Sequence, residues 1–403
     1  MSTVAEVGAA GERGGLALFA HGFRPFFLMA GLVAPASVAI WVAALAGLAV
    51  PEGPLPLVRW HAHELLAGFV GAAMIGFAMT AVPNWTGRRG YSGPPLIAIA
   101  ALFLAARLAL LPGSPVPIGL AAALALLPIP ATILLVLPAL FAARAPRLFA
   151  PPMIILGFWA GQVLMLGDAA AWWQGGTWAT GQMLMANVAL LLVGLIGGRI
   201  VPAFTLNALR REGSPREAKP IPGLDQAAML SLAAVVLSDV IAPASPLSGG
   251  MAAIAAVLVA LRLSRWHGLA TWRWPILWVL HLAYALVPAA LALKAASLLL
   301  GSPWAAAWLH LQTAGALGLM ILAVMTRATL GHTGRDLVAA PATVAAYLCV
   351  LAAAVVRCFG DLVVEDRLVS LSAAGAFWIA GFVLFLVVHA PMLLGPRADG
   401  KAG

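Results

Sequence analysis

The sequence Trp60-His61-Ala62-His63-Glu64 stands at the start of an apolar run over residues 58–82. A run of this length suffices for one helix across a lipid bilayer, which needs about 20 apolar residues. Two imidazoles and a carboxylate are costly at the mouth of such a helix and rarely lack a role there. Residues two apart on a helix point about 200° apart, so His61 and His63 should face different neighbours. Glu64 should lie beside His61, where it can hold the second ring nitrogen.

The rest of the chain repeats this apolar pattern. Of the 403 residues, 63% are hydrophobic and 9% are charged, which is too few charges to cover a water-soluble surface. Runs of about 20 residues favour helices over the short alternating strands of a membrane barrel. The predicted fold class is an all-α polytopic membrane protein. Twelve transmembrane helices are expected, over residues 24–49, 58–82, 94–112, 116–141, 149–170, 177–200, 223–242, 248–264, 274–297, 304–326, 339–359 and 368–393.

Most of the 23 lysines and arginines fall in alternate loops. With the N-terminus inside, these loops are cytoplasmic, as the positive-inside rule requires. The net charge of +9 then reflects membrane orientation, and no nucleic acid partner is expected. Both termini are predicted to be cytoplasmic, and no cleaved signal peptide is expected in residues 1–20. Five basic residues depart from the rule: Arg59, Arg107, Lys294, Arg357 and Arg367.

The ends of spans 2, 6 and 10 resemble one another. Each contains an anchor threonine: Thr86, Thr205 and Thr333. A polar residue stands six positions before each anchor: Thr80, Arg199 and Arg327. The starts of spans 1, 5 and 9 recur with a comparable period. We therefore predict one membrane domain, residues 1–403, built from three four-helix units in a pseudo-threefold arrangement, over about 20–147, 148–268 and 269–397.

The repeat assigns equivalent positions to two histidines. Counting back 23 residues from each anchor threonine gives His63, Gln182 and His310. Two neutral imidazoles at similar depth on facing helices are what a six-coordinate b-type heme requires. Arg59, one turn before His63, is placed to pair with a heme propionate. Two interfacial histidines that hydrogen-bond to loops would give the same pattern, and spacing alone does not separate the two interpretations.

Other candidate residues lie near the predicted inner ends of spans. They are three histidines and three arginines: His21, His332, His389, Arg24, Arg199 and Arg327. They indicate a second heme or a copper site whose propionates are held by arginine. Anchoring by the positive-inside rule explains part of the same pattern.

Five further residues remain to be interpreted. His281 lies inside span 9 and needs a partner from another helix, as a ligand or as a hydrogen-bonding group. His61 and Glu64 are candidates for a neighbouring metal site or for a structural pair. Asp168 and Asp239 stand near outer span ends and are expected to be hydrated.

Five motifs, in this order along the chain, resemble the signatures of the NnrS family. They are His21-Gly22-Phe23-Arg24-Pro25-Phe26-Phe27, Trp60-His61-Ala62-His63-Glu64, and the segments 80–87, 197–205 and 327–335. The resemblance covers essentially the whole chain. It implies a bacterial inner-membrane protein of twelve spans that contains heme and copper. Members of the family are associated with denitrification and with resistance to nitric oxide, so the resemblance implies a context and not a reaction.

The chain resembles more weakly the catalytic subunit of heme-copper oxidases and nitric oxide reductases. That subunit also has twelve spans in three units, with a low-spin heme between histidines of spans 2 and 10. His63 and His310 fit this placement. Span 6 carries Gln182 and Asn187 where that superfamily has a copper-binding histidine, and span 7 lacks a His-His pair. Its binuclear centre is therefore not expected.

We predict a heme and copper protein that contributes to nitric oxide resistance or denitrification, with redox chemistry on a nitrogen oxide at a heme b. The expected metal ligands are His61, His63, His310 and Glu64. The expected partners are the lipid bilayer and nitric oxide; the electron donor is not predicted. One alternative is a transporter or exporter of metal or heme, against which threefold rather than inverted repeats argue. The other is a non-catalytic assembly factor for respiratory enzymes.

Overall fold

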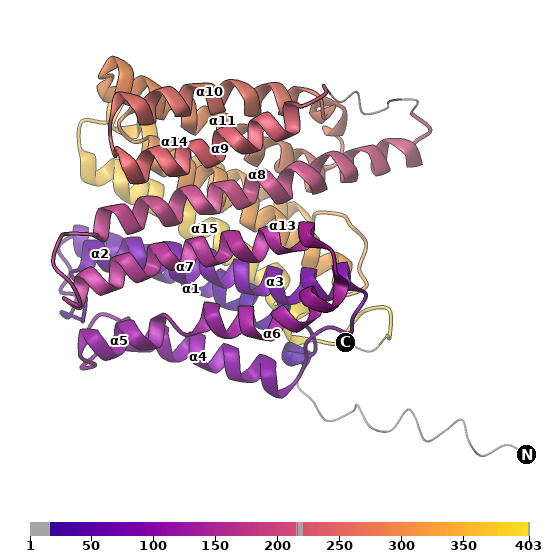
Figure 1. Cartoon of the computed structure of the whole chain (residues 1–403), viewed down its shortest axis with the longest axis horizontal. Helices are drawn as coiled ribbons and strands as arrows, with labels where there is room; N and C mark the ends of the chain where they lie inside the picture. The colour runs from indigo at the N-terminus through magenta and orange to yellow at the C-terminus, as the bar shows by residue number, and fades with distance from the viewer. Residues whose placement is uncertain (1–16, 215, 217–220, 402–403) are drawn as a thin grey trace, which may run out of the picture.

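The protein is a bundle of long helices (Figure 1). The computed structural model describes residues 17–214, 216 and 221–401. Eleven of the described helices are long and apolar enough to cross a membrane, and Pro94–Leu110 is a shorter apolar helix of 17 residues. These elements match all twelve predicted runs, and the described residues contain no strand. The chain is therefore an all-α, multi-pass membrane protein.

The spans follow one another along the chain with short connections. The first half contains α1 (Phe23–Leu45), α2 (Leu57–His63), η2 (Glu64–Val70), α3 (Gly71–Thr86), α4 (Pro94–Leu110), α5 (Ile118–Ala125), α6 (Pro128–Ala143) and α7 (Ala150–Ala169). The second half contains α8 (Trp178–Arg211), α9 (Leu224–Ile241), α10 (Pro246–Ser264), α11 (Pro275–Leu300), α12 (Trp308–His310), η6 (Leu311–Leu317), α13 (Gly318–His332), α14 (Pro341–Phe359) and α15 (Arg367–Leu394). Span 2 comprises α2, η2 and α3, and span 10 comprises α12, η6 and α13.

Proline and glycine determine where many of these helices begin and end. Proline stands in the first turn of α4, α6, α7, α10, α11 and α14. Its fixed φ suits the first turn, where its missing N–H would have no helical partner. Gly87 and Gly301 end α3 and α11 in the left-handed region, at φ 65° and 62°. A side chain would be strained in that conformation.

The described helices pack mainly against their neighbours in sequence. α7 lies along α8, α10 lies along α11, and α14 lies along α15. The contact between α1 and α15 is the main exception, and it joins the first span to the last. The N-terminal and C-terminal spans therefore share one part of the bundle.

Two structural features recur at positions that the predicted repeat aligns. A π-helical segment directly follows His63 in one span and His310 in the other, over Glu64–Val70 and Leu311–Leu317. The anchor threonines of spans 2, 6 and 10 each donate a hydrogen bond to the carbonyl four residues earlier, at 2.7–2.9 Å. These features support the equivalence of the aligned positions. The grouping into three four-helix units stays a prediction.

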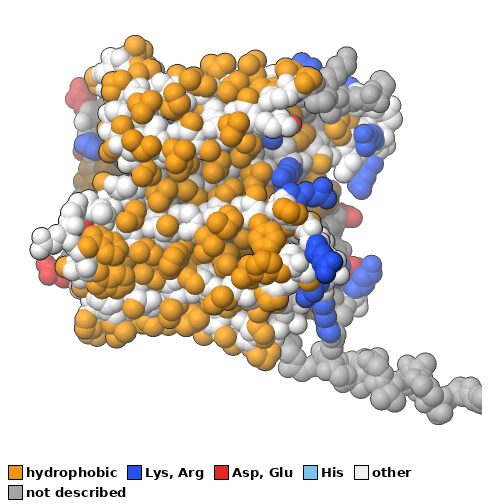
Figure 2. Space-filling model, viewed as in Figure 1, with side chains coloured by type: hydrophobic (Ala, Val, Ile, Leu, Met, Phe, Trp, Pro, Cys, Tyr) orange, Lys and Arg blue, Asp and Glu red, His pale blue; other side chains and the backbone are white. Residues whose placement is uncertain are grey.

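The surface matches a bilayer environment (Figure 2). Hydrophobic side chains cover the flanks, and Lys and Arg gather at the end where both described chain ends lie. Leu134 and Val387, for example, are 68% and 67% exposed, as lipid-facing residues are. The assignment of the basic end to the cytoplasm stays a prediction. Two of the basic residues predicted to be cytoplasmic, Arg13 and Lys219, lie outside the described residues. So does most of the segment 1–20, which was considered for a signal peptide.

Candidate functional site

A cavity of about 840 Å³ lies at the end of the bundle opposite the described chain ends. It is formed by α1, span 2, α8, span 10, α14 and α15. Ligand sites in proteins occupy roughly 300–1,000 Å³ and combine apolar walls with a few polar groups. The charged and titratable residues that line this cavity are Arg59, His61, His310, Arg357 and Arg367. The aromatic residues that line it are Trp41, Phe69, Trp178 and Trp378.

His61 is held against α1. Its ring stacks on Trp41, with ring centroids 5.1 Å apart and planes 22° apart. The ring lies near the backbone carbonyl of Ser37, and the buried Nδ1 makes no well-formed hydrogen bond. His61 and His310 are close enough to interact electrostatically, and the charge of Arg357 acts on both. The cavity therefore receives two imidazoles, from spans 2 and 10.

The His63 side chain is completely buried, away from this cavity. Its Nδ1 lies 3.0 Å from Oε1 of Glu64, and its Nε2 lies 3.3 Å from the amide nitrogen of Gln162 on α7. Arg107 on α4 donates to the same Glu64 oxygen at 2.9 Å. The structure thus corrects two predictions. His61, and not His63, shares the cavity with His310, and Glu64 holds His63 and Arg107 rather than His61.

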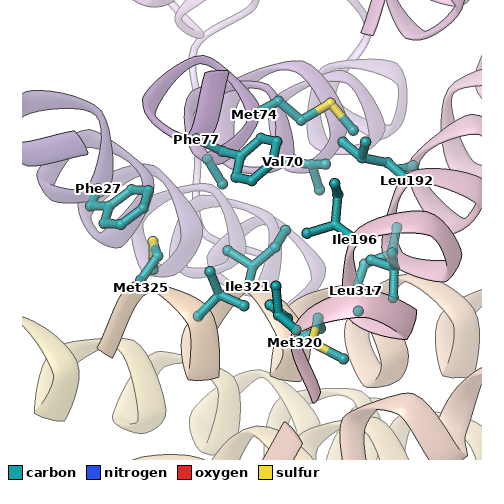
Figure 3. A pocket seen from close by; sticks show the side chains of 16 residues that line it. Phe27, Val70, Met74, Phe77, Leu192, Ile196, Leu317, Met320, Ile321 and Met325 are labelled. Carbon is teal, nitrogen blue, oxygen red and sulfur yellow. The ribbon is translucent and has the colours of Figure 1, made fainter. Parts of the chain in front are cut away.

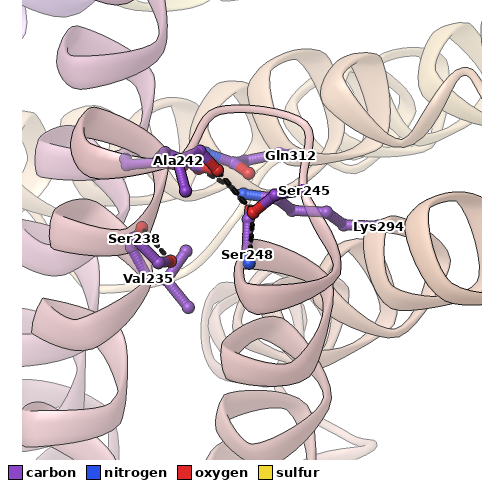
Figure 4. A network of polar contacts seen from close by, with 9 residues as sticks. Val235, Ser238, Ala242, Ser245, Ser248, Lys294 and Gln312 are labelled. Carbon is purple, nitrogen blue, oxygen red and sulfur yellow. Dashed lines mark hydrogen bonds and ion pairs between the residues drawn. The ribbon is translucent and has the colours of Figure 1, made fainter.

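A second buried polar network is formed by side chains of α8, α9, α10, α11 and span 10 (Figure 4). Asp239 forms an ion pair with Lys294 and accepts hydrogen bonds from Asn187, at 2.5 Å, and from Ser248. Gln312 donates to Asn187 at 3.0 Å. Asp239 is only 4% exposed, so the expectation that it is hydrated was wrong. A carboxylate and an ammonium group this deep stabilise the bundle only as a pair.

At the mouth of the cavity, Arg59 has a local partner. Its guanidinium lies 3.2 Å from Asp168 and 4.8 Å from the ring centroid of Trp178. The Arg59 side chain is 40% exposed, so it can also reach a negatively charged group in the cavity.

The predicted inner layer is partly assembled. Phe23 lies between two histidine rings, 6.1 Å from His21 and 5.4 Å from His332. Arg24 is fully buried and donates to the carbonyls of Leu393, at 3.0 Å, and Gly395, at 2.7 Å, where α15 ends. These bonds satisfy carbonyls that a helix C-terminus leaves without partners. Arg24 therefore contributes to holding the end of α15.

The remaining inner candidates have separate surroundings. Nε2 of His281 lies 2.7 Å from the hydroxyl of Thr205. His389 stacks on Phe385 and lies 3.2 Å from the carbonyl of that residue. Arg327 lies over the ring of Phe204, and Arg199 is exposed. Within residues 17–214, 216 and 221–401, no group of three or more His, Cys, Asp or Glu side chains is arranged to hold a metal ion.

The donor set of the cavity fits a heme that His61 and His310 would hold. Two imidazoles come from different spans, the walls are mostly apolar, and three arginines line the same space. Haem iron is commonly held by histidine, and arginine pairs bidentately with carboxylates such as its propionates. Nδ1 of His61 is buried without a well-formed hydrogen bond, and a buried imidazole nitrogen without a partner is one that a bound group can satisfy.

The fold and the cavity define a polytopic helical membrane protein with a histidine-lined site near one membrane surface. A family model described as NnrS protein matches residues 17–397. The chain therefore belongs to the NnrS family. A comparison with curated proteins finds no match.

The sequence interpretation missed several residues of the site. Trp41 and Ser37 were not considered, because an apolar span gives no signal for one aromatic ring among many. Gln162 was not considered either, although it is a buried polar side chain within α7. Arg357 and Arg367 were noted only as exceptions to the positive-inside rule, and that exception was the signal that could have placed them at the cavity.

Proposed function

We propose that the protein is a heme-binding membrane protein of the bacterial nitric oxide response, with a b-type heme held between His61 and His310. Membership of the NnrS family supports the link to nitric oxide. The observation that carries the heme assignment is that both imidazoles line one cavity together with Arg59, Arg357 and Arg367. Location in the bacterial inner membrane and a second metal, copper, follow from the family resemblance and are part of the proposal.

The histidines and arginines of the cavity have defined roles in this proposal. His61 and His310 would provide the imidazole nitrogens that hold the heme iron. The stacked ring of Trp41 fixes the plane of the His61 imidazole, and the Ser37 backbone lies near the same ring. The three arginines are placed to neutralise carboxylates at the mouth of the cavity. When bound, the heme supplies one-electron chemistry suited to a nitrogen oxide.

The proposal is tested by the reduced-minus-oxidised absorbance spectrum of full-length protein, purified after expression with adequate heme. We expect low-spin heme bands near one heme per chain. His61→Ala and His310→Ala should each abolish the low-spin signal, since each removes one of the two imidazoles that would hold the iron. His267→Asn is the matched control, because His267 lies in a loop at φ 56°, a backbone conformation that asparagine tolerates.

Three outcomes would contradict the proposal. They are a wild-type protein without heme bands, unchanged low-spin spectra in both histidine variants, and equal loss in the His267→Asn control. Substoichiometric heme that exchanges readily, together with heme flux in proteoliposomes, would support the transporter alternative instead. Size-exclusion profiles of all variants identify any loss of heme that results from misfolding.

A further inference from the structure

A second, smaller cavity lies where spans 2, 6 and 10 approach one another (Figure 3). Its volume is about 90 Å³. Its walls are entirely apolar: besides Gly197 they consist of Ala, Val, Leu, Ile, Met and Phe side chains. Phe27, Met74, Leu192, Ile196, Met320 and Met325 show the mixture, and Figure 3 shows them arranged around one open space.

The lining excludes most occupants. A buried water needs two to four polar partners, and this cavity offers no polar side chain. Charged or strongly polar ligands would be left without hydrogen bonds, at a large desolvation cost. A heme or a whole lipid is far larger than the space, which is partly open to the surface of the bundle. Small apolar molecules fit, because apolar cavities gain dispersion contacts when xenon-sized molecules enter them. Three methionines add soft, polarizable contacts.

The cavity lies next to the histidine cavity. Val70 lines both spaces, so its side chain forms part of the wall between them. The same pattern holds on the other two spans: Ala186 lines the histidine cavity and Ala189, one turn further on, lines the apolar cavity. On span 10, Thr313 and Leu317 have the same relationship. The two cavities thus follow one another along the same three helices.

We propose that the apolar cavity is a binding site for a small apolar gas, placed directly behind the histidine cavity, with Val70 as the partition. The gas to which the proposed function relates is nitric oxide, which is small and weakly polar. It is therefore the natural occupant that we assign to this cavity. That identification depends on the proposed function; the binding of a small apolar gas to this cavity does not.

Xenon is the probe for this proposal. Crystals of the full-length protein are pressurised with xenon, and the anomalous signal is measured. We expect one xenon peak among α3, α8 and α13. Ala73→Leu places extra carbons in the cavity and should reduce the peak to less than about a tenth, since no room for dispersion contacts is left. Leu192→Ala enlarges the cavity and should increase xenon occupancy.

The matched control is Ala105→Leu, which adds the same carbons on the exposed face of α4 and should leave the peak unchanged. Absence of the peak in wild-type protein would overturn the proposal. So would a peak that is unchanged by both Ala73→Leu and Leu192→Ala, of which the second does not crowd the core. The heme content of the same crystals separates the two proposals. Xenon in heme-free protein supports the cavity alone, whereas heme without xenon supports the proposed function alone.

Discussion

The amide nitrogen of Gln162 lies 3.3 Å from Nε2 of His63, in the interior of the bundle. The other ring nitrogen faces Glu64, so both nitrogens of this imidazole have protein partners. Gln162 in turn donates to the carbonyl of Ala125. His63 therefore links span 2 to α7 and, through Gln162, to the end of α5. His61 and His63 are only two residues apart, yet His61 lines the cavity while His63 connects helices in the interior.

His63→Leu should lower stability without removing heme. The substitution removes one of the two partners of the buried Gln162 amide nitrogen and one of the two partners of Glu64 Oε1, which should lower the free energy of unfolding by about 2–3 kcal/mol. The heme content of the folded fraction should equal that of wild-type protein. Thermal unfolding in detergent, followed by circular dichroism and by heme absorbance, measures both quantities. Loss of the low-spin bands from folded His63→Leu protein would instead reinstate His63 as a ligand.

The buried ion pair between Arg107 and Glu64 should show strong coupling. Arg107→Met leaves a buried carboxylate without its cation and should cost about 3–5 kcal/mol of unfolding free energy. Adding Glu64→Gln to Arg107→Met removes that charge, so the double variant should be more stable than Arg107→Met alone. Asp168→Asn is the control, because its partner Arg59 is 40% exposed and so keeps contact with water when the carboxylate charge is removed, and the loss should be smaller, about 1 kcal/mol. If the losses of unfolding free energy caused by Arg107→Met and Glu64→Gln simply add in the double variant, the two residues are not coupled and this account is wrong.

Close packing of α7 against α8 depends on two glycines. A Cβ added at Gly181 would overlap the carbonyl oxygen of Gly161 and lie 2.8 Å from the backbone nitrogen of Met165. Because backbone cannot move aside cheaply, Gly181→Ala should destabilise the protein by about 1–3 kcal/mol. Gly119→Ala is the control, since its Cβ would meet nothing within 4 Å in α5 and should stabilise that helix slightly. Equal midpoints of thermal unfolding for the two variants would refute the prediction.

The cluster around His21 should make stability depend on pH. His21 precedes the first span, and burial, followed by the charges of Arg24 and its neighbours, lowers the pKa of its imidazole. Above the unfolded pKa of about 6.5, both states hold a neutral ring and nothing is lost. Below it, the unfolded chain binds a proton that the folded protein does not, so stability falls as the pH decreases.

The measurement compares unfolding midpoints between pH 7.5 and pH 5.5. His21→Asn should make the fall shallower than in wild-type protein, because the proton uptake of one unfolded imidazole is removed. His267→Asn also removes one imidazole but leaves the His21 cluster intact, so its profile should stay closer to wild type. A His21→Asn profile that coincides with that of wild-type protein would exclude this contribution.

The helical architecture could be predicted because the bilayer imposes a simple rule. Each span needs about 20 apolar residues, and charges concentrate in the loops. Most span boundaries were predicted within a few residues, and the span at residues 94–112 was found as the shorter helix Pro94–Leu110. The largest exception is α8, which continues to Arg211, well beyond the predicted end at residue 200. Interruptions such as the break between α5 and α6, before Pro128, leave only a weak trace in an apolar sequence.

The pairing of His63 with His310 could not be settled from the repeat, because a repeat gives the position along a helix and not the direction of a side chain. The three-unit arrangement itself stays a prediction, and equivalent positions in such an arrangement can face either a common axis or separate interfaces. His61 has no equivalent histidine, and its direction toward α1 becomes visible only through its contact with Trp41.

The most informative sequence signal was the set of five basic residues that depart from the positive-inside rule. Arg107 and Lys294 form the two buried ion pairs. Arg59, Arg357 and Arg367 line the histidine cavity. A cation far from the basic end of a membrane protein requires a partner or a function. These five exceptions therefore locate the polar interior better than the histidine motif does.

The two π-helical segments also affect how the histidine cavity can change during evolution. A π-helical turn accommodates one more residue than an α-helical turn, and each residue of a helix adds about 100° of rotation. In span 2 the segment Glu64–Val70 therefore sets the orientation of the outer part, with His61, independently of the inner part. Loss of a single codon from this segment would turn His61 away from the cavity while the inner helix kept its neighbours. The set of side chains that face the cavity is thus open to change by small insertions and deletions, without rebuilding the bundle that supports it.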